Sequence, residues 1–395
     1  MFLLFIVPLL FLFLLSRFQH KPYPPGPKGW PLIGNMAMME QLTHRGLANL
    51  AKQYGGMFHL RMGSQHIVVV SNSDISRQIL QVQDNIFSNR PVTVAISRKR
   101  VESWDSVRDE VDQMIRIVAT KTGTAVNIDS IIDDHIQKKD PTNGLNEAKR
   151  DMVDELLEFY SDENKVSVLR ELDNSIKLKR NNIKAIIMDV MFGGTEAVAS
   201  AVEWVMAELM RNPEELKKVQ QELVNTVGLS RKVEESDLEK LTYLRCCIKE
   251  VLRLHPPIPL LLHQNAGAVV VADYLVPPKS LVLINVWAIG HDSNTWGDPD
   301  SFKPSRFMKD GVPDFKGNDF EFIPFGSGRR SCPGMQLALY EMDMVLAHLL
   351  HCFSWELPDG MKPSELDMDD VFGLTVPRAT RLVALPSPRL SCPLF

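Results

Sequence analysis

The chain has 395 residues, of which 45% are hydrophobic and 24% charged, and its formal net charge is −5. Such a composition predicts a globular protein with a sizeable core. It argues against a nucleic-acid partner, because the charge balance is mildly acidic and no basic tract with interleaved aromatic residues occurs. The five cysteines follow neither a disulfide nor a zinc pattern, which is typical of a reducing cytosol.

The chain begins with an almost continuously apolar run over residues 1–16. As a helix this run would span about 22 Å, short of the roughly 30 Å hydrocarbon core of a membrane. The basic residues Arg17 and Lys21 follow the run instead of preceding it. We therefore predict a membrane signal anchor, with the following chain on the cytosolic side, rather than a cleaved signal peptide. Residues 17–35 are rich in proline and predict a stiff hinge before the main domain, residues 36–395.

Hydrophobic periodicity predicts a mainly α fold with small β-sheets. Helices are expected over residues 44–58, 73–83, 98–118, 147–160, 176–211, 213–228 and 237–254, and after Cys332. Strands are expected over residues 57–60, 67–70, 267–286 and 379–386, with an irregular stretch over 290–331. The helix over 176–211 is apolar on more than one face, which predicts a central position.

Cys332 lies in a ten-residue segment that leads into a helix, Phe325-Gly-Ser-Gly328-Arg-Arg330-Ser-Cys332-Pro-Gly334. The glycines permit a tight turn and let a flat group approach the backbone. N–H groups at the start of the helix favour an anionic sulfur, and Arg330 offers a cation for a carboxylate. The alternatives are a buried structural cysteine and a phosphate-binding loop, but this segment has no Lys-Ser/Thr pair for a nucleotide.

This segment resembles the haem-binding signature of the cytochrome P450 family. The resemblance implies the P450 fold, with Cys332 as the axial ligand of the iron of haem b and Arg330 on a haem propionate. It also implies a second propionate contact from His263, for which a structural loop histidine is the alternative. The other cofactor-binding residues that it implies are Phe325, Gly328 and Gly334.

A second motif, Glu250-Val-Leu-Arg253, places a carboxylate and a guanidinium on one helix face. Alone, this pair is common and usually lies on a solvated surface. Together with the downstream Arg306 it resembles the buried Glu–Arg–Arg cluster of the family. The resemblance implies a structural role for this cluster, which holds the segment that leads into the cysteine loop.

The long predicted helix contains Gly193-Gly194-Thr195-Glu196-Ala197. Two glycines inside a helix cost roughly 1 kcal/mol each, so either something approaches the backbone or the helix opens there; a packing kink is the alternative. The resemblance implies catalytic roles for Glu196 and Thr195 in oxygen activation. The family has an alcohol directly after the acid, where this chain has Ala197, and Thr195 is rotated by about 100° around the helix. We therefore expect poor coupling, with reducing equivalents lost as hydrogen peroxide.

The chain is short in its N-terminal half. The spacing from Glu196 to Cys332 matches the family, whereas the part before Glu196 lacks roughly a hundred residues. The deficit is expected near residues 97–130. Trp104 and Arg108 have the spacing of a haem-propionate helix, but their charged surroundings favour a surface helix.

Three segments are similar to plant ferulate (coniferaldehyde) 5-hydroxylases of lignin synthesis, namely residues 186–194, 255–263 and 357–368. The resemblance implies a monooxygenase at the endoplasmic reticulum membrane that hydroxylates the ring of a phenylpropanoid. Electrons would come from NADPH through a cytochrome reductase. The substrate-pocket residues that it implies are Leu260, Leu261 and Phe372.

Two other functions remain open at this point. The first is a shortened, non-catalytic haem-binding remnant, which Ala197 and the missing residues favour. The second is a thiolate-haem isomerase or dehydratase, which would need no external oxygen.

Overall fold

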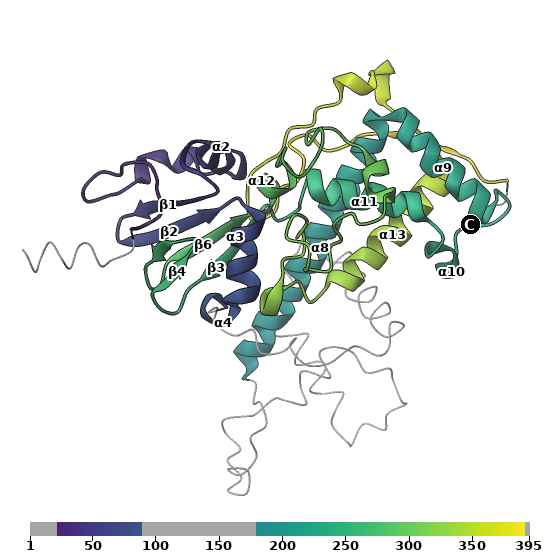
Figure 1. Cartoon of the computed structure of the whole chain (residues 1–395). Coiled ribbons are helices and arrows are strands. Elements are labelled where there is room, and N and C mark those ends of the chain that lie inside the picture. The colour runs from purple at the N-terminus through teal and green to yellow at the C-terminus, as the bar shows by residue number, and fades with distance from the viewer. Residues whose placement is uncertain (1–21, 89–178, 392–395) are drawn as a thin grey trace, which may run out of the picture. The chain divides into compact units, whose positions relative to one another are not determined.

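The computed structural model describes residues 22–88 and 179–391, except for a few side chains of one helix that include Thr195 (Figure 1). The chain divides into two compact units, residues 1–91 together with 196–395, and residues 92–195. The expected anchor, the helices over 98–118 and 147–160 and the shortened region near 97–130 lie outside the described residues. None of the described helices is both long enough and apolar enough to cross a membrane.

A four-stranded sheet forms one part of the larger unit (Figure 1). Its order is β1 (Met57–Met62), β2 (Gln65–Val70), β6 (Leu281–Asn285) and β3 (Leu260–Gln264). β2 and β6 are parallel and the other neighbours antiparallel. The predicted hairpin is confirmed, and Gly63 at φ +60 makes its turn. Helix α2 (His44–Tyr54) packs its Leu47 against one face of the sheet.

Two small antiparallel sheets accompany this one. They pair β4 (Val269–Val271) with β5 (Tyr274–Val276), and β7 (Phe353–Glu356) with β8 (Leu385–Pro388). The strands expected over 267–286 are therefore found, whereas β3 was not predicted as a strand. The strand expected over 379–386 is wrong for most of its length. The backbone N–H of Leu382 donates to the Glu203 side chain of a helix instead of to a neighbouring strand.

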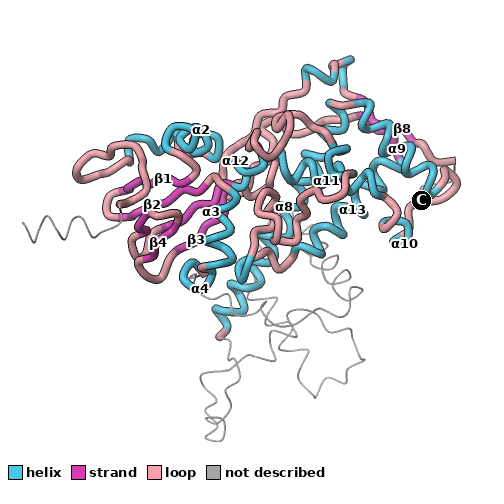
Figure 2. Tube along the Cα trace, in the orientation of Figure 1, coloured by secondary structure: helices cyan, strands magenta, loops and turns pink. Residues whose placement is uncertain are grey.

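The helical part of the larger unit holds the largest apolar core (Figure 2). It contains the second half of α8 (Arg180–Arg211), and α9 (Pro213–Val227), α10 (Glu235–Leu238), α11 (Thr242–Leu254) and α13 (Met335–Cys352). Trp204, Leu244, Val251, Leu346 and Leu350 are fully buried there. The predicted central position of α8 agrees with Trp204 lying in this core.

The single helix expected over 237–254 is instead two helices. A capping box between Glu234 and Asp237 caps the N-terminus of the short α10. The carboxylate of Glu222, on α9, then accepts the backbone N–H groups of Tyr243 and Leu244 at 2.6 and 3.0 Å. A side chain from another helix therefore caps α11, which fixes its first turn.

The remaining elements are short. The helix expected over 73–83 forms as α3 (Ser73–Arg77), continued by a wider, π-type turn η2 (Gln78–Val82). The others are η1 (Met36–Gln41), α4 (Asp84–Phe87), α12 (Val286–Gly290), η3 (Pro304–Met308), η4 (Gly328–Arg330), η5 (Pro358–Gly360) and η6 (Pro363–Glu365). The stretch over 290–331 contains only such short turns, as predicted.

Candidate functional site

The loop Phe325–Gly334 is closed on itself directly before α13. The backbone N–H of Cys332 donates to the carbonyl oxygen of Phe325 at 2.8 Å. Gly326 and Gly328 have φ values of +72 and +68, which an L side chain rarely adopts. The Phe325 ring packs edge-to-face on Phe315. Cys332 is a free cysteine and is exposed as a residue.

Two effects act on the pKa of the Cys332 thiol in opposite directions. Desolvation raises the pKa of the Cys332 thiol, and the hydrogen bond from the N–H of Gly334 offsets only part of that rise. The Gly334 N–H is one of the groups expected to favour an anionic sulfur, and the thiolate itself stays a prediction. Coordination to a metal cation would deprotonate this thiol outright.

The loop contacts η2, α4 and the residue after α4, all of which precede it by far in the sequence. A Cβ at Gly328 would lie 2.2 Å from the carbonyl oxygen of Leu80, so only glycine allows this approach. Arg329 pairs with Asp84 at 2.8 Å. The guanidinium of Arg330 donates through Nε and Nη2 to the carbonyl oxygen of Ser88, at 3.1 and 2.5 Å. Three consecutive residues therefore fix the position of the loop.

Strand β3 brings two of the predicted site residues to the loop. Side chains two apart on a strand share a face. Leu261 and His263 therefore share one face, and Leu261 lies beside Gly326 of the loop. His263 is buried, and Ser88, the acceptor of Arg330, bridges to its neighbour Gln264.

Two predicted pocket residues lie elsewhere. Leu260 is on the opposite face of β3 and packs with the cluster around Leu47 of α2. The ring of Phe372 is 40% exposed and stands 5.7 Å from the His44 ring. The structure therefore does not bring Leu260 and Leu261 onto one surface, because adjacent residues of a strand point in opposite directions.

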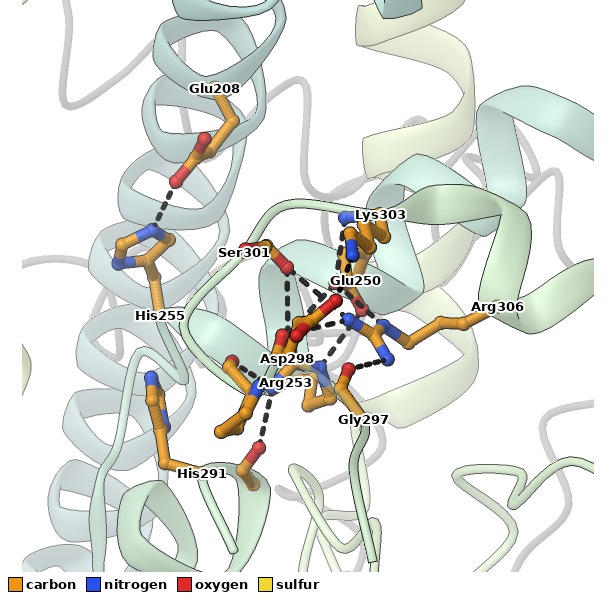
Figure 3. Close-up of polar contacts among 12 residues, drawn as sticks. Glu208, Glu250, Arg253, His255, His291, Gly297, Asp298, Ser301, Lys303 and Arg306 are labelled. Atoms are coloured by element: carbon orange, nitrogen blue, oxygen red, sulfur yellow. Dashed lines mark hydrogen bonds and ion pairs between the residues drawn. The ribbon is translucent and has the colours of Figure 1, made fainter. Parts of the chain in front are cut away.

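Glu250, Arg253 and Arg306 form one buried cluster (Figure 3). The Glu250 carboxylate accepts from Arg253 at 2.9 and 2.8 Å, from Arg306 at 2.9 Å and from the backbone N–H of Lys303 at 2.9 Å. Arg253 also donates to the carbonyl oxygens of Gly290 and Pro299. These bonds join α11 to the irregular stretch over 290–331 that leads into the cysteine loop.

Around Glu196, α8 remains a regular helix. It continues without interruption through Gly193 and Gly194, and no described atom lies within 4 Å of a Cβ built on either glycine. The expected opening or close approach is therefore not found among the described residues. The Glu196 carboxylate accepts a hydrogen bond of 2.8 Å from the hydroxyl of Thr375. The Thr195 side chain lies outside the described part of the chain.

The donor set of the site suits haem better than a bare metal ion. Among residues 22–88 and 179–391, no group of three or more His, Cys, Asp and Glu side chains could hold a metal. Haem iron needs only one or two axial ligands from the protein, because the macrocycle supplies the other four. The free cysteine Cys332, whose sulfur lies beside Gly334 at the start of α13, fits that requirement.

Sequence reasoning missed three contributors. The Ser88 carbonyl oxygen and the Lys303 N–H act through the backbone, which carries no residue-specific signal. Thr375 was not among the predicted catalytic residues, although Phe372 of the same segment was a predicted pocket residue. Nothing near it in the sequence indicates a partner 179 residues away.

Known proteins match nearly the whole chain. A family model described as Cytochrome P450 matches residues 24–107 and 104–383. Cytochrome P450 84A1 of Arabidopsis thaliana is 51% identical over 502 aligned residues, which cover 99% of this chain and 96% of the relative. Cytochrome P450 84A4 of the same plant is 44% identical over 509 residues, with 99% and 98% covered. A flavonoid 3'-monooxygenase of Crocosmia x crocosmiiflora is 33% identical over 476 residues, with 94% of each chain covered.

These alignments are longer than the chain itself. The alignment with Cytochrome P450 84A1 extends over 502 positions, whereas this chain has 395 residues. The relative therefore has residues that this chain lacks. The two segments that match the family model meet at residues 104–107.

Proposed function

The chain belongs to the cytochrome P450 family, and on this premise we propose that it is a haem-thiolate monooxygenase that hydroxylates the ring of a ferulate- or coniferaldehyde-type phenylpropanoid. The observation that carries this proposal is the free cysteine Cys332 in a loop fixed by Gly328 and Arg330. Oxygen would be the second substrate. NADPH would supply the electrons through a cytochrome reductase at the endoplasmic reticulum membrane.

The residues of the site have separate roles in this proposal. The Cys332 sulfur would be the axial ligand, and Arg330 and His263 would bind the propionates of the haem. The haem supplies oxygen activation, which electron donation from a thiolate ligand favours. Glu196 would hold a proton at its carboxylate for the oxygen chemistry. The Glu250 cluster would keep the segment before the loop in place without touching the substrate.

The ligand assignment is tested by the carbon-monoxide difference spectrum of the reduced protein. We expect a band typical of thiolate-ligated haem in the unchanged protein and its loss in Cys332→Ser. Cys246→Ser is the control, because Cys246 is also a free cysteine but is buried in the helical core. A thiolate band that survives in Cys332→Ser would contradict the proposal.

The substrate class rests on the segments similar to ferulate 5-hydroxylases, and β3 with its Leu261 lies in one of them. We expect ferulate, coniferaldehyde or coniferyl alcohol to shift the haem spectrum on binding, and NADPH with a plant reductase to give a ring-hydroxylated product. A panel that includes a flavonoid and an alkaloid tests this assignment. Binding shifts from either of these, without one from a lignin precursor, would overturn it.

A non-catalytic haem-binding remnant is the second candidate. Two observations favour it, namely Ala197 after the acid and the many positions that the chain lacks relative to Cytochrome P450 84A1. The junction at residues 104–107 supports the expected shortening near 97–130. A thiolate carbon-monoxide band without NADPH-dependent product would favour the remnant.

A further inference from the structure

The segment Thr375–Leu382 follows the second half of α8 and bonds to it turn after turn. Thr375 reaches Glu196, and the indole Nε1 of Trp204 donates to the carbonyl oxygen of Val376 at 3.1 Å. At the far end, the backbone N–H of Leu382 donates to Glu203 at 2.8 Å. Residues three or four apart on a helix share a face. One face of α8 is therefore bonded to this segment.

These bonds hold the Thr375 hydroxyl in place. Thr375 is only 6% exposed. The carbonyl oxygen of the next residue, Val376, accepts from Ser200 and Trp204, and its N–H donates to the carbonyl oxygen of Pro257. The backbone that carries the hydroxyl is thus fixed on two sides. Glu196, by contrast, is exposed, and its carboxylate is oriented by this hydroxyl.

We infer that Thr375 is a positioning residue for Glu196 and that its hydroxyl serves as the alcohol partner of this acid, a partner that Ala197 cannot provide. The inference rests on the proposed function. The Thr375 hydroxyl keeps its proton, donates it as a hydrogen bond to Glu196 Oε1 and so orients the carboxylate. Ala197 then no longer implies loss of reducing equivalents, contrary to the sequence-based expectation.

Unfolding equilibria test the contact without any haem chemistry. Thr375→Val and Glu196→Gln are measured singly and together. We expect their effects to be non-additive by roughly threefold to tenfold in the unfolding constant, because a hydrogen bond to a charged group is lost only once. Ser200→Ala is the control, since Ser200 bonds to Val376 from the same face of α8 but not to Glu196. Additive effects of Thr375→Val and Glu196→Gln would overturn the inference.

Hydrogen peroxide released per NADPH oxidised tests the role in the reaction. We expect Thr375→Val to raise the ratio of peroxide to product roughly tenfold, the factor that one charge-assisted hydrogen bond supplies. Thr375→Ser should remain near the native ratio, and Ala197→Thr should restore it in the Thr375→Val background. Ser200→Ala removes only one of the two hydrogen bonds to the Val376 carbonyl oxygen, so it should raise the ratio less than Thr375→Val does.

The outcomes separate this inference from the proposed function. An unchanged peroxide ratio in Thr375→Val, with a full carbon-monoxide band, overturns the inference alone. A native protein that releases mostly peroxide and is improved by Ala197→Thr also overturns it. If the unchanged protein gives no thiolate band, the proposed function fails and the inference fails with it, whatever the unfolding measurements show.

Discussion

Glu250 is the buried charge with the most complete set of partners in the described site. Its side chain has no exposed surface, and two guanidiniums and one backbone N–H satisfy it. Such an ion pair contributes little net stability compared with apolar residues, but removal of one partner leaves a buried charge without compensation. The cluster therefore specifies one arrangement of the chain before the cysteine loop.

At this scale we predict that Glu250→Gln lowers the free energy of unfolding by about 3–5 kcal/mol, because two buried guanidiniums lose their counterion. Denaturant unfolding measures the change. The matched control is Glu214→Gln, since Glu214 also pairs with a cation three residues on, Lys217, but both side chains are more than two-thirds exposed. That variant should change stability by at most about 0.5 kcal/mol. Equal changes in the free energy of unfolding for Glu250→Gln and Glu214→Gln would show that burial of the cluster does not make the loss of Glu250 more costly.

The conformation of the cysteine loop depends both on backbone dihedral angles that favour glycine and on the close approach of its backbone to a neighbouring segment. Gly63 and Gly328 both have positive φ, at +60 and +68. Only Gly328 also faces a backbone atom, the Leu80 carbonyl oxygen, within a distance that no Cβ can occupy. Around Gly63, no described atom lies within 4 Å of an added Cβ. A substitution at Gly63 would therefore cause only conformational strain, whereas one at Gly328 would also cause a steric clash.

We predict that Gly63→Ala costs about 1–2 kcal/mol of stability, which is the strain of a left-handed L residue. Gly328→Ala should cost clearly more, because the loop must also move away from η2. Thermal unfolding, with the carbon-monoxide band as a readout of loop geometry, compares the two. If both variants lose the same stability and keep the same band, the close approach at Leu80 does not constrain the loop.

For the whole molecule, buried neutral histidines make stability depend on pH. Burial is the main cause that lowers the pKa of His291 to about 3, and Arg253, His255 and Arg45 lower it further by repulsion. The ring stacks on Trp287 and bonds to its carbonyl oxygen. The unfolded chain binds this proton below about pH 6.5, whereas the native protein does not. The contribution of neutral His291 to the free energy of unfolding is therefore fully present above that pH. It declines as the pH falls towards 3.

We predict that His291→Gln removes about 2 kcal/mol of the stability loss between pH 6.5 and pH 5, at 1.4 kcal/mol per pH unit. Urea unfolding at both pH values measures it. Part of the acid sensitivity should remain, because burial, with repulsion from His66 and Arg61, lowers the pKa of His59 to about 4. An unchanged difference between the two pH values in His291→Gln would exclude His291 as a source.

Local patterns of residues were sufficient to predict the mainly α fold, the β1–β2 hairpin, the long α8 and the Cys332 loop, because each depends on neighbours in sequence. Periodicity and glycine positions report directly on backbone geometry. The same patterns failed where distant groups decide the outcome. The Glu222 carboxylate caps α11 from another helix, and the segment at Leu382 bonds to Glu203 instead of forming a strand.

The features of the candidate site also fall into two groups, those that local motifs predict and those that depend on tertiary packing. Cys332 and the Glu250–Arg253 pair lie in short motifs whose chemistry is legible in the sequence. The contact of Arg330 with Ser88, the separation of Leu260 from Leu261 and the bond between Thr375 and Glu196 arise only when strands, loops and α8 pack together. A hydrogen bond across 179 residues leaves no trace in local composition. Tertiary packing alone decided which hydroxyl meets the acid.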